Sequence, residues 1–294
     1  MGIILGLTAA LGWGSADFLV RYATRFIGTY RTLFYMQFVG FVALGAYLLF
    51  SGEMGRLLAR TSWQPWVLAL LVGVLSMLGS LALYRAFEVG VLSIVSPIAA
   101  SYAALTVALS LLSGERVSQA RGLGIIAVLI GIALAATPLT PANTIPEEAK
   151  RRRKGLVARG VGWSLAASVM YGVDFWLLGF HVAPELGGIA PVWLIRLTTL
   201  CTVPLVTLPM RQSLRPPSGK IWWLIMAIGL IDTTGFVALT LGVTTDQVSL
   251  ISVLSSLFSA VTVLLAWLFL HERLHWSQWL GIGIIFVSIA LVNA

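Results

Sequence analysis

Long apolar runs alternate with short polar segments along the whole chain. Each run holds about 20 residues with few charges, enough for a helix to cross a membrane core of roughly 30 Å. The runs are continuously apolar and too long for the tilted, alternating strands of a membrane barrel. The pattern predicts an all-α polytopic membrane protein with ten transmembrane helices. The expected spans are 3–20, 32–50, 66–87, 93–113 and 119–137 in the first half, and 157–178, 188–209, 221–241, 249–270 and 277–293 in the second.

A short motif occurs twice. Gly114-Glu115-Arg116-Val117 returns 157 residues later as His271-Glu272-Arg273-Leu274, and over positions 114–134 eight of 21 residues are identical at this offset. We interpret the chain as a duplicated unit. Since each copy holds five spans, an odd number, the second copy is expected to be inverted relative to the first, with a central cavity between them. The predicted division is a first repeat at 1–137, a linker at 138–156 and a second repeat at 157–294.

Composition supports a membrane protein. Apolar residues form 59% of the chain and charged residues 10%, whereas soluble domains carry about 25% charged residues. The net charge of +8 comes from residues in loops beside the spans, which favours contact with anionic lipid headgroups over nucleic acid. With a single cysteine, Cys201, and histidines only at span ends, we expect no metal and no cofactor. The expected partners are membrane lipid and a small solute; monomer and homodimer both stay open.

Basic residues predict the orientation. The segment after the first repeat carries the run Lys150-Arg151-Arg152-Arg153-Lys154. Basic loops stay on the cytoplasmic side, so the linker 138–156 is expected in the cytoplasm and both termini outside. The expected location is the plasma membrane, the inner membrane in a bacterium, as a multi-pass protein.

Two local patterns resemble the EamA-type members of the drug/metabolite transporter superfamily. One runs from Ala86 to Pro97 and on to Gly114-Glu115-Arg116-Val117; the other is the matching Leu270–Leu274. The resemblance implies a ten-helix bundle with a central cavity that moves small organic solutes by alternating access without ATP. The chain has no phosphate-cradling Gly-x-x-x-x-Gly-Lys loop, so coupling to a proton gradient, another ion gradient or the solute's own gradient is expected. Leu254 stands opposite Pro97, which suggests that only the first copy bends at this depth.

Few charged residues lie within the spans, and these are the candidates for solute binding. Ionisable groups are costly inside a membrane, so they should face a wet cavity or a partner. Asp17 and Asp174 are related by the 157-residue offset, and each precedes a phenylalanine. For Asp17, an ion pair with Arg21 one turn away is an equal alternative. Asp174 has no such neighbour, so its partner is expected on another helix or on the solute.

Arg196 and Asp232 lie near the centres of spans 7 and 8 and have no counterpart in the first copy at the strict offset. Alignment on the resembling family, with a short gap, places Gln37 opposite Arg196. Two interpretations are equal: a buried Arg196–carboxylate pair that joins helices, or an Arg196 that binds a solute carboxylate while Asp174 or Asp232 binds an amine or carries a proton. An amino acid would use both signs of charge, which makes it the preferred class of solute.

Aromatic residues accompany the membrane aspartates. Trp13 lies one turn before Asp17 and Tyr171 one turn before Asp174, while Tyr84 continues a stripe with Ser76 and Ser80. Such rings can hold a cationic solute, although packing is the commoner role for any single ring. The predicted substrate-binding set is Asp174, Arg196, Asp232, Asp17, Trp13, Tyr84, Tyr171 and Gln37.

The expected function is therefore that of a secondary transporter, an exporter of a small organic metabolite such as an amino acid, and not an enzyme. A lipid-moving protein or passive channel is the alternative. An intramembrane protease is a weaker one, because Tyr171-Gly172-Val173-Asp174 only partly matches the Gly-x-Gly-Asp pattern. Glu115 and Glu272 are expected to cap helices or form interfacial ion pairs rather than contact the solute.

Overall fold

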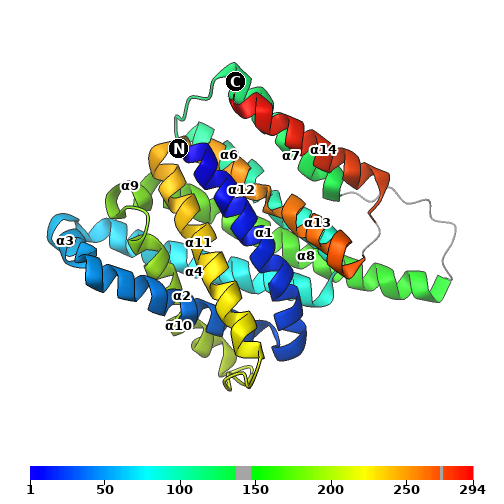
Figure 1. Ribbon diagram of the computed structural model, residues 1–294, viewed down its shortest axis with the longest axis horizontal. Helices are drawn as coiled ribbons and strands as arrows, with labels where there is room; N and C mark the ends of the chain where they lie inside the picture. The colour runs from blue at the N-terminus through cyan, green and yellow to red at the C-terminus, as the bar shows by residue number, and fades with distance from the viewer. Residues whose placement is uncertain (137–146, 272–273, 294) are drawn as a thin grey trace.

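The computed structural model describes residues 1–136, 147–271 and 274–293, and every regular element in them is a helix (Figure 1). The predicted all-α class is confirmed. The elements of the first half are α1 (Gly2–Ile27), α2 (Thr29–Ser51), α3 (Glu53–Arg60), α4 (Trp63–Val89), α5 (Leu92–Ala100), α6 (Tyr102–Leu112) and α7 (Gln119–Ala136). Those of the second half are α8 (Glu147–Leu177), the π-helical turn η1 (Leu178–Val182), α9 (Ala183–Leu186), α10 (Ala190–Thr207), α11 (Ile221–Thr245), α12 (Val248–Ser256), α13 (Phe258–Leu270) and α14 (Trp276–Asn293).

Within the described ranges, eight helical segments are long and apolar enough to cross a membrane. They correspond to eight of the predicted spans, four in each half. The predicted span 119–137 forms α7, whose apolar stretch Gln119–Leu134 is shorter. The predicted span 277–293 falls on α14, where several side chains lie outside the description. The chain is a multi-pass membrane protein, and the number of ten crossings stays a prediction.

The predicted linker is partly helical. Helix α8 begins at Glu147, so the backbone of the basic run 150–154 continues without interruption into the apolar part of that helix. The remainder of the linker lies outside the described residues.

Both halves break one membrane segment in two. Pro97 lies inside α5, and since proline removes a helical hydrogen bond, the break before α6 at Ser101 was expected. The second half breaks too, between α12 and α13 at Leu257. The expectation that only the first copy bends is therefore wrong.

Serine chemistry explains the second break. Ser256 Oγ donates to the Val253 carbonyl at 2.6 Å, and Ser255 Oγ donates to the Ser252 carbonyl at 3.0 Å. Ser101 Oγ makes the same type of bond, to Ile98, in the first half. Such hydroxyl-to-carbonyl bonds compete with the main-chain ladder and bend helices, so serines can do at Leu257 what proline does in α5.

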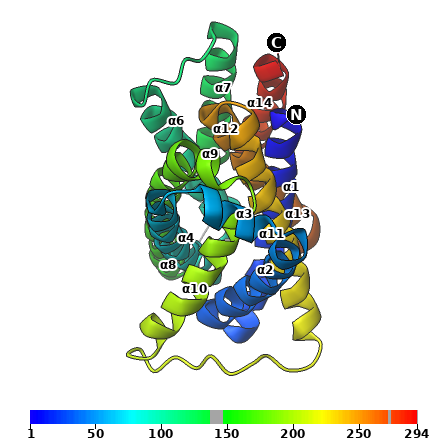
Figure 2. The ribbon, with the colours of Figure 1, turned by 90° about the vertical axis from the view of Figure 1, so that its left-hand side faces the viewer.

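The two halves pack against each other reciprocally. Helix α1 of the first half packs along α11 of the second, and α8 of the second packs along α4 of the first. Likewise α2 packs on α11, and α10 packs on α4. In Figure 1 the blue α1 and yellow α11 run side by side, while α7 and α14 form a separate pair at one edge. Figure 2 shows α4 beside α8, and both chain ends toward one end of the bundle. The buried core thus lies between the halves.

The offset between equivalent positions varies along the chain. Helices α4 and α11 end at Val89 and Thr245, 156 residues apart, and the breaks at Ser101 and Leu257 are also 156 apart. Within these segments the counterpart of Asp232 is therefore Ser76. The strict 157-residue offset had hidden this relationship.

Candidate functional site

A small cavity of about 30 Å³ lies between the two halves. Helices from both halves contribute to its wall. Its lining residues are Trp13, Asp17, Gln37, Ser80, Leu83, Tyr84, Tyr102, Tyr171, Phe175, Arg196, Asp232, Phe236 and Phe258. Seven of the eight predicted substrate-binding residues are among them, and Asp174 is not. Its lining is mostly apolar with a few convergent polar groups, a composition that is typical of small-molecule sites.

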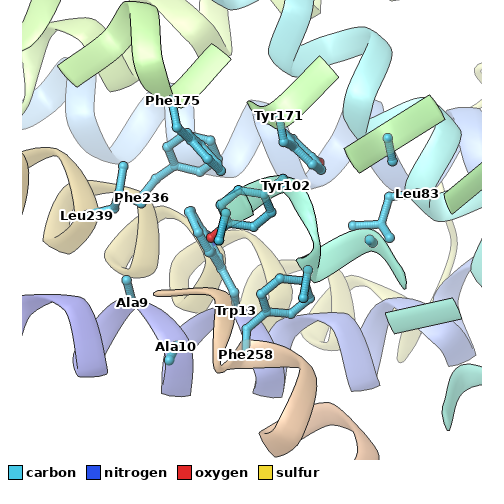
Figure 3. Packing of buried hydrophobic residues seen from close by; sticks show 14 of the residues in the cluster. Ala9, Ala10, Trp13, Leu83, Tyr102, Tyr171, Phe175, Phe236, Leu239 and Phe258 are labelled. Carbon is cyan, nitrogen blue, oxygen red and sulfur yellow. The ribbon is translucent and has the colours of Figure 1, made fainter. Parts of the chain in front are cut away.

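Six of the rings that line the cavity contact one another, and we call them the aromatic wall: Trp13, Tyr102, Tyr171, Phe175, Phe236 and Phe258. Phe175 lies at its centre, stacked on Trp13 and on Tyr171 with ring centroids 5.5 Å apart in each case. Tyr102 meets the same ring edge-on at 4.8 Å. Figure 3 shows these rings converging from α1, α6, α8, α11 and α13, with Tyr171 and Phe175 both on α8. Such offset and edge-to-face contacts stabilise beyond the area they bury.

Glycines allow the wall to form. Gly235 of α11 carries no side chain where Trp13 crosses it: a Cβ there would lie 2.9 Å from Trp13 Cδ1. In the other half Gly79 leaves the same kind of space for Tyr171, because a Cβ at Gly79 would lie 3.0 Å from Tyr171 Cε1. The two glycines are 156 residues apart, so each half seats a ring of the opposite half.

Arg196 is an interior cation with three contacts. Its Nη2 lies 2.8 Å from Asp232 Oδ2, its Nη1 donates to Gln37 Oε1, and its Cζ lies 4.9 Å from the centre of the Phe236 ring. The side chain is 1% exposed. Of the two interpretations of Arg196, this geometry supports the buried pair, and it selects Asp232 rather than Asp174 as the carboxylate.

Asp17 lines the cavity, and no described residue pairs with it. It is 5% exposed and forms no hydrogen bond or ion pair with any residue that the structure describes. The alternative of a pair with Arg21 is wrong. Arg21 instead reaches the end of α4, where its Nη1 donates to the carbonyls of Phe87 and Gly90 at 2.8 Å each. Carbonyls at a helix C-terminus attract a cation, which explains why Arg21 turns away. Asp17 and Asp232 both line the cavity, so two carboxylates share its wall.

Asp174 is fully buried outside the cavity lining. Ser76 Oγ donates to its Oδ2 at 2.9 Å, while Oδ1 has no hydrogen-bond partner among the described residues. The aspartates at equivalent positions thus have different surroundings. Asp174 faces the hydroxyl of Ser76, whereas Asp17 shares the cavity wall with Asp232, the counterpart of Ser76.

Hydroxyl groups fix the tyrosines of the cavity. Tyr171 Oη and Ser80 Oγ are 2.9 Å apart, and Tyr102 Oη and Ser255 Oγ are 2.8 Å apart. Tyr84 Oη donates to Met36 Sδ at 3.1 Å.

Six lining residues were not in the predicted set: Ser80, Leu83, Tyr102, Phe175, Phe236 and Phe258. Two of them carried a usable signal, since Tyr102 and Phe258 directly follow the two helix breaks. Phe175 follows Asp174 and was noted only as a marker of the repeat.

Glu115 has the capping role that was expected. Its carboxylate accepts from the backbone amide of Ser249, with Oε2 at 3.2 Å, in the first turn of α12. Glu272, its partner in the repeat, lies outside the described residues. In the part of the chain that the structure describes, no group of three His, Cys, Asp or Glu side chains is placed to hold a metal ion.

Comparison with known proteins gives a family match in both halves. The EamA-like transporter family matches residues 1–137 and 158–294. A solved structure titled "Crystal structure of protein" superposes with a TM-score of 0.73 at 20% identity, covering 99% of this chain and 96% of that chain. At this identity the likeness shows a shared fold. No curated protein matches the chain.

Proposed function

Because the chain belongs to the EamA-like transporter family, we propose that it is a secondary transporter that moves a small organic metabolite by alternating access. The observation that carries this proposal is the cavity between the halves, where charged side chains lie inside a membrane protein. Charged groups in such a place mark a solute or ion pathway. The cavity draws residues from both halves, so a movement of one half against the other would change access to it.

The proposed architecture is two inverted repeats of five spans each, over 1–137 and 157–294. Reciprocal packing of α1 on α11 and of α8 on α4 supports it, as do the equivalent helix breaks at Ser101 and Leu257. In this arrangement the linker 138–156 lies in the cytoplasm and the termini outside.

The proposed solute carries an amino group, and amino acids are one such class. Asp17 supports this, as a carboxylate in the cavity wall with no partner among the described side chains. Export is the proposed direction, driven by a proton gradient, another ion gradient or the gradient of the solute. Family membership supports transport rather than catalysis.

Transport by the purified protein in liposomes tests the proposal. Proteoliposomes preloaded with unlabelled amino acids or amines are expected to take up the labelled solute by exchange, and protein-free liposomes are not. The same vesicles would carry a fluorescent lipid in one leaflet. If the lipid equilibrates while no solute of any charge class exchanges under a pH gradient or a membrane potential, the protein moves lipid and the proposal is wrong.

A further inference from the structure

We propose that the cavity selects solutes of net positive charge, small organic amines without a carboxylate, and that their ammonium group binds Asp17 against the aromatic wall. The inference rests on the proposed function and narrows its class of solute. It follows from two observations: Arg196 is paired with Asp232, and Asp17 has no partner among the described residues.

Among the described residues that line the cavity, the one cation is already paired with a carboxylate. Among its lining residues Arg196 is the single basic one. That guanidinium already contacts Asp232, Gln37 and the Phe236 ring. A solute carboxylate would compete with Asp232 for this single positive charge, and displacing Asp232 would leave it buried without its counter-charge, which is strongly unfavourable. A zwitterion therefore gains little at its acidic end.

The cavity does have a free anionic position. Its wall carries two carboxylates, Asp17 and Asp232, against one guanidinium. The pair of Arg196 with Asp232 leaves Asp17, 5% exposed and without a hydrogen bond or ion pair to any described residue. A buried carboxylate that lacks a partner is unfavourable when charged. An ammonium group from the solute provides the missing counter-charge.

The aromatic wall supplies the second half of the recognition. Trp13 lies one turn before Asp17 on α1, so their side chains share one face of that helix. Ring faces attract cations, more strongly where water is excluded. The contact between Arg196 and the Phe236 ring, with Cζ 4.9 Å from the ring centre, is such an interaction within this cavity. The apolar body of an amine would pack on the remaining rings.

The other half provides a matched control. Asp174 occupies the position equivalent to Asp17 but lies outside the cavity lining and accepts a hydrogen bond from Ser76. Replacing either aspartate by asparagine changes one buried carboxylate to an amide of the same shape. Only the change at Asp17 alters the charge of the cavity wall.

Three probes of similar size separate the charge classes: phenethylamine, phenylalanine and 3-phenylpropionate, with net charges near +1, 0 and −1 at neutral pH. Titration calorimetry on the full-length protein in nanodiscs measures their affinities. We expect phenethylamine to bind at least about tenfold more tightly than phenylalanine, a difference of roughly 1.4 kcal/mol, and 3-phenylpropionate to bind least.

Variants then test the role of Asp17. We expect Asp17→Asn to weaken phenethylamine binding at least about tenfold, Asp17→Glu to retain most of it, and Asp174→Asn to leave it within about twofold. Size-exclusion profiles and thermal unfolding of each variant establish that it is folded. Should Asp17→Asn not fold, the comparison of the three probes on the native protein decides alone.

Two results would overturn the inference: tighter binding of phenylalanine or 3-phenylpropionate than of phenethylamine, or no binding of phenethylamine. Exchange in proteoliposomes separates this failure from that of the proposed function. If a neutral or anionic solute exchanges while amines do not, the protein is a transporter and the amine class is wrong. If no solute of any class exchanges, the transport proposal itself fails.

Discussion

Gln37 and Arg196 occupy equivalent positions in the two halves, 159 residues apart, and hydrogen-bond to each other inside the bundle. The turns before their helices agree with this offset, since Gly28 and Gly187, both with positive φ, are also 159 apart. Equivalent residues can touch only where the axis that relates them passes between them. Tyr102 and Phe258, 156 apart, stack in the same way with centroids 6.4 Å apart. In the proposed inverted-repeat architecture, the cavity therefore lies on the axis that relates the two halves.

Loss of Arg196 should destabilise the protein strongly. Arg196→Ala leaves Asp232 as a buried carboxylate without its cation, a change that costs on the order of 3–5 kcal/mol. We expect a large drop in the midpoint of thermal unfolding in detergent. The double variant with Asp232→Asn should recover part of that loss, because it removes the unpaired charge.

The control for this rescue is Asp174→Asn in the Arg196→Ala background. Asp174 contacts Ser76, not Arg196, so the Asp174→Asn change should not restore any of the stability lost in Arg196→Ala. A double Arg196→Ala, Asp232→Asn variant that is less stable than either single variant would argue against the pairing.

Ser76→Ala should lower the free energy of unfolding, because it removes the hydroxyl that donates a hydrogen bond to Asp174. Ser76 Oγ is the donor to Asp174 Oδ2 at 2.9 Å, and a buried acceptor left without a donor costs about 1–3 kcal/mol. A double-mutant cycle with Asp174→Ala measures the coupling through unfolding free energies. Additive effects of the two changes would show that the hydrogen bond contributes nothing to stability.

The sequence predicted the helical class because long apolar runs leave few alternatives in a membrane. It did not predict the break at Leu257. The position lacks proline, and the serines that take its place, Ser255 and Ser256, form local hydrogen bonds that apolar periodicity does not report.

The candidate site was predicted unevenly for a physical reason. Charges inside spans are rare, so Asp17, Arg196 and Asp232 could be identified from composition alone, and all three line the cavity. The pairing of Arg196 with Asp232 could not be predicted from the sequence, because it depends on how α1, α10 and α11 are rotated in the bundle. A constant repeat offset also concealed the relation of Ser76 to Asp232, since the halves differ by short insertions.

Gly235→Ala should disturb the aromatic wall. The new methyl group would lie 2.9 Å from Trp13 Cδ1 and 3.1 Å from Nε1, so either α1 and α11 separate or the indole turns. Overpacking of this kind costs about 1–3 kcal/mol. Thermal unfolding and Trp fluorescence measure both effects.

The matched control is Gly162→Ala on α8, where no atom lies within 4 Å of the added methyl group. Alanine favours helix over glycine by up to about 1 kcal/mol, so this variant should be equal to or more stable than the native protein. Equal stability of both alanine variants would show that Trp13 does not need the space at Gly235.

Glu115→Ala should lower the stability of the protein without changing the cavity between the halves. The carboxylate of Glu115 accepts from the amide of Ser249 at the start of α12, where the helix end is positive. Loss of a cap costs about 1 kcal/mol, so we expect a lower unfolding midpoint and unchanged solute affinity, since Glu115 does not line the cavity. Glu115→Gln keeps an acceptor and should lose less. Glu185→Ala is the control, because Glu185 is exposed and has no hydrogen bond to any described residue. A Glu115→Ala variant with native stability but weaker solute binding would move Glu115 from a structural role to a functional one.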